Sequence, residues 1–310
     1  MKQLKPIIEM PEYIKRLEKA VEKVIFDAVF KDVLSVVRKY KLKNFENSSS
    51  ALRGALLAGK VQFSNGKFTG KFSSSISKEL KTMGAKRIKS GWSINEAKLP
   101  FAIQSAVAVA TQHFKNMHQD ILDVLAPEKV VLTIEQSDFT AEYAQNLRGL
   151  ESQFKQSVKA VGVTPDLTFD SMLAISENYS NNMKLYIQKW SDDNVLKLRE
   201  LVYDNSMNGF RAEKLAKIIE RNFSVSKKKA KFLARQETAL MMSTFQENRF
   251  KDAGVTKYRW STSKDSRVRD LHEDLDGKIF TWNEAVIDEH GNRGNPGEAF
   301  GCRCIAIPII

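Results

Sequence analysis

Few residues in this sequence can end or interrupt a helix. Glycine occurs 15 times and proline 7 times among 310 residues, whereas average usage of about 7% and 5% would give roughly 22 and 15. Long segments instead carry apolar residues at intervals of three and four, which is the spacing of one helix face. Residues 11–43 show this pattern from Ile14 through Leu17 and Val21 to Val33. We therefore predict a mainly helical chain with long helices.

Two short regions are typical of β-strands. In residues 60–72, apolar positions alternate on either side of Asn65-Gly66, a dipeptide that favours the tight type I′ turn of a hairpin. The chain closes on residues 302–310, from Cys302 to Ile310, which are mostly apolar and β-branched, and this predicts a buried terminal strand that includes both cysteines. The expected fold class is α+β: mainly helical, with a small N-terminal β-hairpin region and a compact C-terminal domain whose terminal strand is buried.

Polar clusters divide the helical pattern into segments. Asp192-Asp193 is expected to begin a new helix, and Ser224 to Ser226 are expected to separate a helix at 211–221 from one at 227–254. The turn cluster Asn-Ser-Ser-Ser at 47–50 is expected to end the first helix. The expected domains are an N-terminal amphipathic helix (1–46), a small α/β domain containing the 60–72 hairpin (47–130), a helical middle region (131–226) and a C-terminal domain (227–310).

The positive charge is concentrated at one end of the chain. The net charge is +12, and residues 1–100 hold 21 Lys and Arg against 9 Asp and Glu, whereas residues 101–226 sum to −3 and residues 227–310 to +3. A field of this sign attracts polyanions such as nucleic acid or an acidic protein surface, although it can also serve solubility alone. The longest strongly apolar run, 101–110, is too short to span a bilayer, so no membrane partner is expected.

The sequence lacks the signatures of the common catalytic sites. It has no phosphate-binding glycine-rich loop with Lys-Ser/Thr, no Gly-x-Ser-x-Gly and no His-Glu-x-x-His, so no catalytic or cofactor-binding residue is assigned. His272, Cys302 and Cys304 form one constellation that could supply three of the four ligands of a structural zinc ion. The alternative is two small buried thiols beside a hydrogen-bonded histidine. We predict the second arrangement, without a bound metal, and keep a zinc site as the less favoured interpretation.

Two charged residues interrupt apolar faces. Glu237 falls within the apolar stripe of the 227–253 helix. Arg303 of the terminal strand is expected to point away from the cysteines, toward the side that bears Ile305, Ile307 and Ile309. Each charge would be costly to bury alone, so we predict a buried Glu237–Arg303 ion pair. The alternative is that the helix or strand is rotated so that its charge reaches water.

The same residues carry a resemblance to a known family. The run Ala234-Arg-Gln-Glu-Thr238, the segment from Asp265 to His272, Leu275-Asp-Gly277, Pro296-Gly297 and Cys302-Arg-Cys304 follow one another in an order that resembles the C-terminal domain of the phage Mu F-like minor head proteins. The residues that we assign to this structural motif are Arg235, Glu237, Asp265, Arg267, His272, Asp276, Gly277, Cys302, Arg303 and Cys304.

The resemblance implies a non-enzymatic minor capsid protein of a tailed phage or prophage, active in head morphogenesis. Its implied partners are the portal protein, capsid or scaffolding proteins and double-stranded DNA bound without sequence preference. Its implied locations are the virion head interior or portal vertex and, during assembly, the host cytoplasm, where it would assist virion assembly and DNA packaging or ejection. The alternatives are a dedicated sequence-independent DNA-binding protein and a metal-dependent nuclease.

The resemblance also bears on the cysteines. Many relatives carry Cys-x-x-Cys where this chain has Arg269 and His272, and His-Pro-Asn where it has Ala299-Phe-Gly301. Of those presumptive metal ligands, this chain keeps only His272, Cys302 and Cys304. The resemblance therefore implies a subtype in which these residues act as a packing motif.

Overall fold

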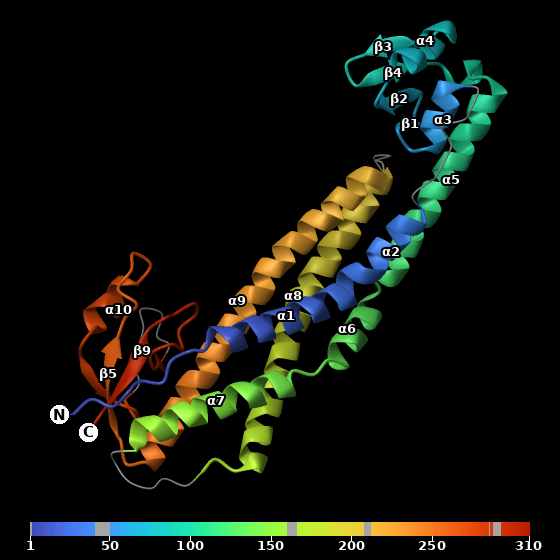
Figure 1. Cartoon of the computed structure of the whole chain (residues 1–310). Coiled ribbons are helices and arrows are strands. Elements are labelled where there is room, and N and C mark those ends of the chain that lie inside the picture. Colours follow the sequence, from blue (N-terminus) through green and yellow to red (C-terminus); the bar gives the residue numbers. More distant parts are fainter. Residues whose placement is uncertain (1, 41–49, 160–165, 208–211, 285, 288–292) are drawn as a thin grey trace. The chain divides into compact units, whose positions relative to one another are not determined.

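The computed structural model describes residues 2–40, 50–159, 166–207, 212–284, 286–287 and 293–310. Most of these residues lie in helices, and the strands form small antiparallel sheets (Figure 1). The predicted α+β, mainly helical class is therefore confirmed.

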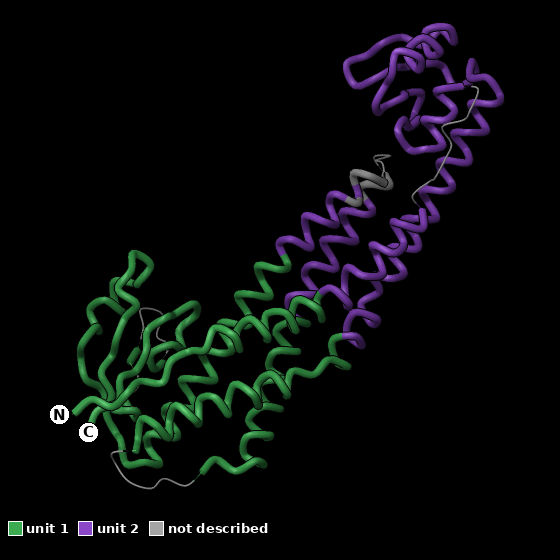
Figure 2. The backbone as a smooth tube through the Cα atoms, in the orientation of Figure 1, with its two compact units in different colours: residues 1–25, 134–188, 226–310 green, residues 26–133, 189–225 purple. Residues whose placement is uncertain are grey.

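The chain forms two compact units, each assembled from segments far apart in the sequence (Figure 2). Unit 1 contains residues 1–25, 134–188 and 226–310, and unit 2 contains residues 26–133 and 189–225. The helices α8 (Phe169–Met207) and α9 (Ala212–Asp252) contribute residues to both. The units do not test whether the four segments expected from the sequence fold independently, so that division stays a prediction.

The N-terminal helix forms with one local change of winding. The chain is α-helical in α1 (Pro11–Ile25), widens into a π-helical turn, η1 (Phe26–Phe30), and continues as α2 (Lys31–Lys39). Ile14, Leu17 and Val21 are buried, as their spacing predicts. The end of the predicted helix, 41–43, lies outside the described residues.

A small subdomain with its own hydrophobic core occupies the beginning of unit 2. It comprises α3 (Ala51–Leu57), α4 (Ser74–Thr82), the short 3₁₀ helix η2 (Glu96–Lys98) and a four-stranded sheet of order β1-β2-β4-β3, and it packs against the start of α5 (Phe101–Val124). The strands are β1 (Val61–Ser64), β2 (Lys67–Gly70), β3 (Lys86–Ile88) and β4 (Gly91–Ser93).

The predicted hairpin is confirmed. β1 pairs with β2 through a two-residue turn in which Asn65 has φ 49° and Gly66 has φ 70°, the positive values that a type I′ turn requires. Asparagine and glycine adopt this conformation at low cost, so the local sequence alone determines the turn.

Two predicted helix boundaries are wrong, because α8 runs without interruption past Asp192-Asp193 and α9 past Ser224 to Ser226. Both aspartates are exposed. Water therefore solvates their carboxylates in the middle of the helix just as it would at a helix N-terminus. The Ser224 hydroxyl donates a hydrogen bond to the Glu220 carbonyl one turn earlier, so this side chain is satisfied within the helix.

Unit 1 contains α1, α7 (Thr140–Val158), the first half of α8, the second half of α9 and the C-terminal sheet. That sheet has the order β6-β5-β9, with β5 (Lys257–Ser261) between β6 (Ile279–Thr281) and β9 (Ile305–Ile309). A separate pair, β7 (Val286–Ile287) and β8 (Arg293–Gly294), and the short helix α10 (Asp270–Leu275) lie in the connections. The helix α6 (Pro127–Glu135) precedes α7.

The terminal strand β9 is largely buried. Ala306, Pro308 and Ile309 are buried, and the start of the chain pairs along the strand, with the Leu4 N–H donating to the Pro308 carbonyl at 2.9 Å. Figure 1 shows β9 beside β5 and the N-terminal segment within unit 1. The prediction of a buried terminal strand is therefore confirmed.

No helix in the described ranges combines the length and apolar character needed to cross a bilayer.

Candidate metal centre and the surrounding motif

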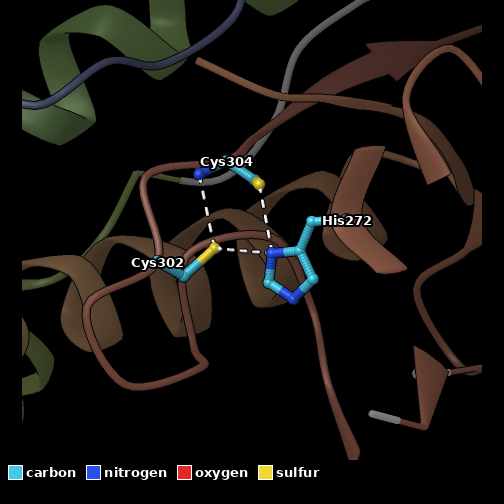
Figure 3. Close-up of side chains that lie close together, drawn as sticks. All are labelled: His272, Cys302 and Cys304. Carbon is cyan, nitrogen blue, oxygen red and sulfur yellow. Dashed lines mark hydrogen bonds between the residues drawn. The ribbon is translucent and has the colours of Figure 1, made fainter. Parts of the chain in front are cut away.

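Three metal-ligating side chains converge in unit 1 (Figure 3). The Cys302 sulfur lies 3.5 Å from His272 Nδ1, and the Cys304 sulfur lies 3.4 Å from the same nitrogen. The three ligand atoms lie within 4.8 Å of one another, and no fourth His, Cys, Asp or Glu joins them in the described part of the chain. The structure thus brings together the three residues that the sequence singled out.

Two different elements hold this cluster. His272 lies on α10, whereas both cysteines lie in the irregular segment immediately before β9. The expectation that Cys302 and Cys304 belong to the strand itself is therefore wrong. Their sulfurs still point to the same place because the Cys304 backbone N–H donates to the Cys302 sulfur at 3.4 Å, which bends the chain around that atom.

The environment favours one thiolate in the pair. Cys304 and His272 are buried, and Cys302 is partly buried. Hydrogen bonds from the Cys304 thiol and from the backbone N–H groups of Cys304 and Gly297 lower the pKa of Cys302 well below its ordinary value. The pKa of Cys304 is raised, chiefly because its thiol proton is held by Cys302 and also because it is buried. Cys302 is thus the residue that ionises first.

The Gly297 contact requires glycine. This residue has φ +95°, a backbone conformation that residues with a side chain rarely adopt. The Pro296-Gly297 motif therefore has a local role, because it turns a backbone N–H group toward the cysteine cluster.

Arg303 does not pair with Glu237, so that prediction is wrong. Its guanidinium forms two hydrogen bonds with the Asp265 carboxylate, at 2.5 and 2.6 Å. Both side chains are more than one-third exposed, and the hydrogen bonds from Arg303 lower the pKa of Asp265 to about 2. The expectation failed because Arg303 precedes the strand and is not held to the alternation of β9.

Glu237 is buried, as its place in the helix predicts, but none of the residues that the structure describes forms an ion pair with it. Its side chain is 2% exposed, and burial raises its pKa to about 7. Its charge in turn raises the pKa values of Tyr143 of α7 and of Tyr179 and Tyr186 of α8, where burial is the larger cause for Tyr143 and Tyr179. Burial therefore favours the protonated form of Glu237, and its charge influences tyrosines of two other helices.

A buried ion pair does occur on α9, at a position that sequence reasoning missed. Arg249 donates to both carboxylate oxygens of Glu151 of α7, at 2.8 and 3.1 Å, and the two side chains are 6% and 9% exposed. The guanidinium also lies 4.6 Å from the centre of the Phe154 ring. The partners are 98 residues apart in the sequence, so no local pattern joins them.

The other motif residues have structural contacts or lie at the surface. Asp276 accepts hydrogen bonds from the backbone and hydroxyl of Thr262 at the end of β5. Gly277, with φ +78°, donates to the Trp260 carbonyl.

The two other arginines of the motif lie at the surface. The Arg267 guanidinium lies 3.9 Å from the Asp265 carboxylate, and the Arg267 side chain is 77% exposed. Arg235 is exposed. Burial of Glu9 raises the pKa of that carboxyl group, and the positive charge of Arg235 partly offsets this rise.

A second polar network fixes the segment before the cysteines to α9. The Gly301 N–H donates to the Gln236 side chain at 2.7 Å, and the Ser243 hydroxyl donates to Glu298 at 2.9 Å. Glu298 also accepts from the Asn295 N–H at 2.8 Å. Sequence reasoning did not select these residues, although Gln236 stands between the two motif residues Arg235 and Glu237 that it did select.

Comparison with known proteins identifies the region that contains this site. Residues 196–307 match the family model described as Phage Mu protein F like protein. An uncharacterized protein of Haemophilus influenzae is 32% identical over 114 residues, which cover 37% of this chain and 25% of that protein. The chain thus matches about a quarter of the length of this curated relative. No solved structure matches. The family resemblance carried by the motifs is confirmed for this part of the chain: residues 196–307 form a Phage Mu protein F-like region.

Proposed function

We propose that this protein is a non-enzymatic head morphogenesis protein of a tailed phage or prophage. The observation that carries the proposal is the match of residues 196–307 to the Phage Mu protein F-like family. In this proposal the chain is a minor capsid component that associates with the portal and the procapsid interior and assists DNA packaging or ejection.

The contacts of the motif residues support a structural role. Asp265 holds Arg303, Asp276 holds the end of β5, and Gln236 holds Gly301. These polar side chains bond to other parts of the same domain, which is the pattern of a fold-stabilising motif. A catalytic set would instead direct several such groups toward one reacting atom.

Quantitative mass spectrometry of purified heads tests this proposal. Procapsids and mature heads produced by the element that encodes the chain should contain it at low copy number relative to the major capsid protein. Detergent-free extracts should also yield it together with the portal protein. Absence from both procapsids and mature heads would contradict the proposal.

The subdomain at residues 50–99 supports a contact with DNA. It contains ten Lys and Arg residues but only Glu79 and Glu96 as acids, and all ten basic residues are exposed. Glu79 accepts hydrogen bonds from Ser50 and from the N–H groups that begin α3, and Glu96 accepts one from the Gly66 N–H. The two acids are thus used inside the subdomain, which leaves its surface strongly positive.

The charge density of this subdomain exceeds that of the preceding segment. Residues 1–46 hold 11 basic against 7 acidic residues. Within the sheet, Lys67 of β2 and Lys86 of β3 both flank Ser93 of β4, so the two lysines share one face. A cluster of this kind suits the regularly spaced phosphates of double-stranded DNA and carries no base-reading geometry.

Two charge-reversal variants of the full chain test the DNA contact. Lys67→Glu, Lys86→Glu and Lys89→Glu together should weaken binding to a short DNA duplex at least tenfold at about 50 mM salt, because several phosphate contacts become repulsive. The control combines Lys15→Glu, Lys19→Glu and Lys23→Glu on the exposed side of α1, and it changes the net charge equally.

Fluorescence anisotropy with a labelled duplex gives both affinities and their salt dependence. The expected result is a large loss for the subdomain variant and a small one for the control. Equal losses would place the contact outside the subdomain. No binding by the unaltered chain at low salt would refute the DNA contact and favour an acidic protein partner.

A further inference from the structure

Two sulfurs compete for a single nitrogen in the cluster of unit 1. Cys302 and Cys304 approach His272 Nδ1 to 3.5 and 3.4 Å (Figure 3). A ring nitrogen has either one lone pair or one hydrogen, so it can form a full hydrogen bond with only one of the two thiols. The Cys304 thiol and the Cys304 backbone N–H also donate to the Cys302 sulfur, so both sulfurs stay within ligand distance of one imidazole nitrogen.

A cation bound between the three atoms would use all of them as ligands at once. Zinc binds cysteine sulfur at about 2.3 Å and histidine nitrogen at about 2.0–2.1 Å in tetrahedral geometry, so a sulfur and a nitrogen on one zinc ion stand roughly 3.5 Å apart. The two sulfur-to-nitrogen distances in this protein match that separation. We propose that His272 Nδ1, Cys302 Sγ and Cys304 Sγ together bind one zinc ion.

The surroundings of the cluster suit thiolate ligands. Backbone N–H groups donate to the Cys302 sulfur, and such outer hydrogen bonds orient metal ligands and stabilise their charge. The Trp260 ring lies edge-on to the His272 ring, with 5.3 Å between centroids, and fixes the plane of the imidazole. The donor set of two thiolates and one imidazole favours zinc over magnesium or calcium, which prefer oxygen ligands.

The proposed ion has a structural consequence for this domain. His272 belongs to α10, and the cysteines lead directly into β9, so the ion would join two segments that are separated by 30 residues in the chain. Zinc in structural sites is almost always four-coordinate. The described residues supply three ligands, so water or a group from a binding partner would complete the coordination.

Metal analysis of the purified full chain under reducing conditions tests the site directly. We expect one zinc ion per chain, retained in competition with a chromophoric chelator. Substitution with cobalt(II) should give the absorption bands of a tetrahedral site and thiolate-to-cobalt charge transfer. The unaltered chain gives these readouts without any mutation, so they do not depend on the folding of a variant.

Variants then assign the ligands. Cys302→Ser, Cys304→Ser and His272→Gln should each lower the zinc affinity at least tenfold, whereas His113→Gln, which changes a histidine of unit 2, should leave it unchanged. Circular dichroism establishes that each variant is folded. A folded, reduced, unaltered chain that takes up no zinc or cobalt, or one whose affinity is unchanged by all three substitutions, would overturn the proposal.

Discussion

Glu237 makes the stability of unit 1 depend on pH in a direction opposite to that of most carboxylates. Its folded pKa is about 7, raised by burial from an ordinary value of 4.5. Below pH 4.5 the carboxyl group is protonated in both the folded and the unfolded state. As the pH rises, the unfolded chain loses this proton first, so the free energy of unfolding falls between about pH 4.5 and 7 and is constant above that range.

The size of the effect follows from the two pKa values. At about 1.4 kcal/mol per pKa unit, the difference destabilises the folded state by ~3 kcal/mol above pH 7. The Glu237→Gln variant keeps the shape of the side chain and carries no charge at any pH. It should therefore be more stable than the unaltered protein by up to ~3 kcal/mol at pH 8 and nearly equal to it at pH 4.5.

Urea denaturation followed by far-ultraviolet circular dichroism at several pH values measures this difference. The control is Glu220→Gln, which removes a carboxylate from an exposed position on the same helix and should change the midpoint little at any pH. Equal midpoints for the Glu237→Gln variant and the unaltered protein at pH 8 would refute the reasoning, as would a larger gain at pH 4.5 than at pH 8.

Three further predictions concern contacts that the structure contains. Arg249→Met should cost about 3–5 kcal/mol because it leaves the Glu151 carboxylate buried without its partner, and the Arg249→Met/Glu151→Leu double variant should recover much of this loss in urea denaturation. Asp265→Asn should lower the melting temperature at pH 6, because it removes the carboxylate that pairs with Arg303. The difference in melting temperature between the variant and the unaltered protein should vanish as the pH falls from about 4 to 2, since Asp265, with a folded pKa of about 2, is then protonated and loses its charge. Gly91→Ala should destabilise the small subdomain by roughly 2–4 kcal/mol in the same denaturation assay, since its φ is +150° and a Cβ would collide with a backbone carbonyl of β2.

The features that the sequence predicts well are those that depend on neighbouring residues. The turn at Asn65-Gly66 requires positive φ at two successive positions, and few other dipeptides adopt it at low cost. The burial of Glu237 follows from the phase of one helix. In both cases the relevant geometry is complete within about ten residues.

The features that it predicts poorly depend on which elements meet. The phase of α9 indicates that Glu237 is buried but not that its charge acts on tyrosines of α7 and α8. A guanidinium and a carboxylate 98 residues apart form the buried pair that was expected elsewhere. The β-branched residues that follow Arg303 predict a strand that includes it, yet β9 begins only at Ile305, so strand alternation does not orient this side chain.

The contacts of residues 295–304 explain why the family motifs are polar and widely spaced. This segment contains no helix or strand, so its backbone groups have few regular partners and must be satisfied by side chains. Gln236 of α9 reaches Gly301, Arg269 reaches the Phe300 carbonyl, and Asp265 reaches Arg303. Each contact comes from a different part of the region, and each acts on the stretch that leads into β9. The motif residues therefore set the path by which the chain enters its last strand, and the proposed zinc ion would act on the same stretch through Cys302 and Cys304.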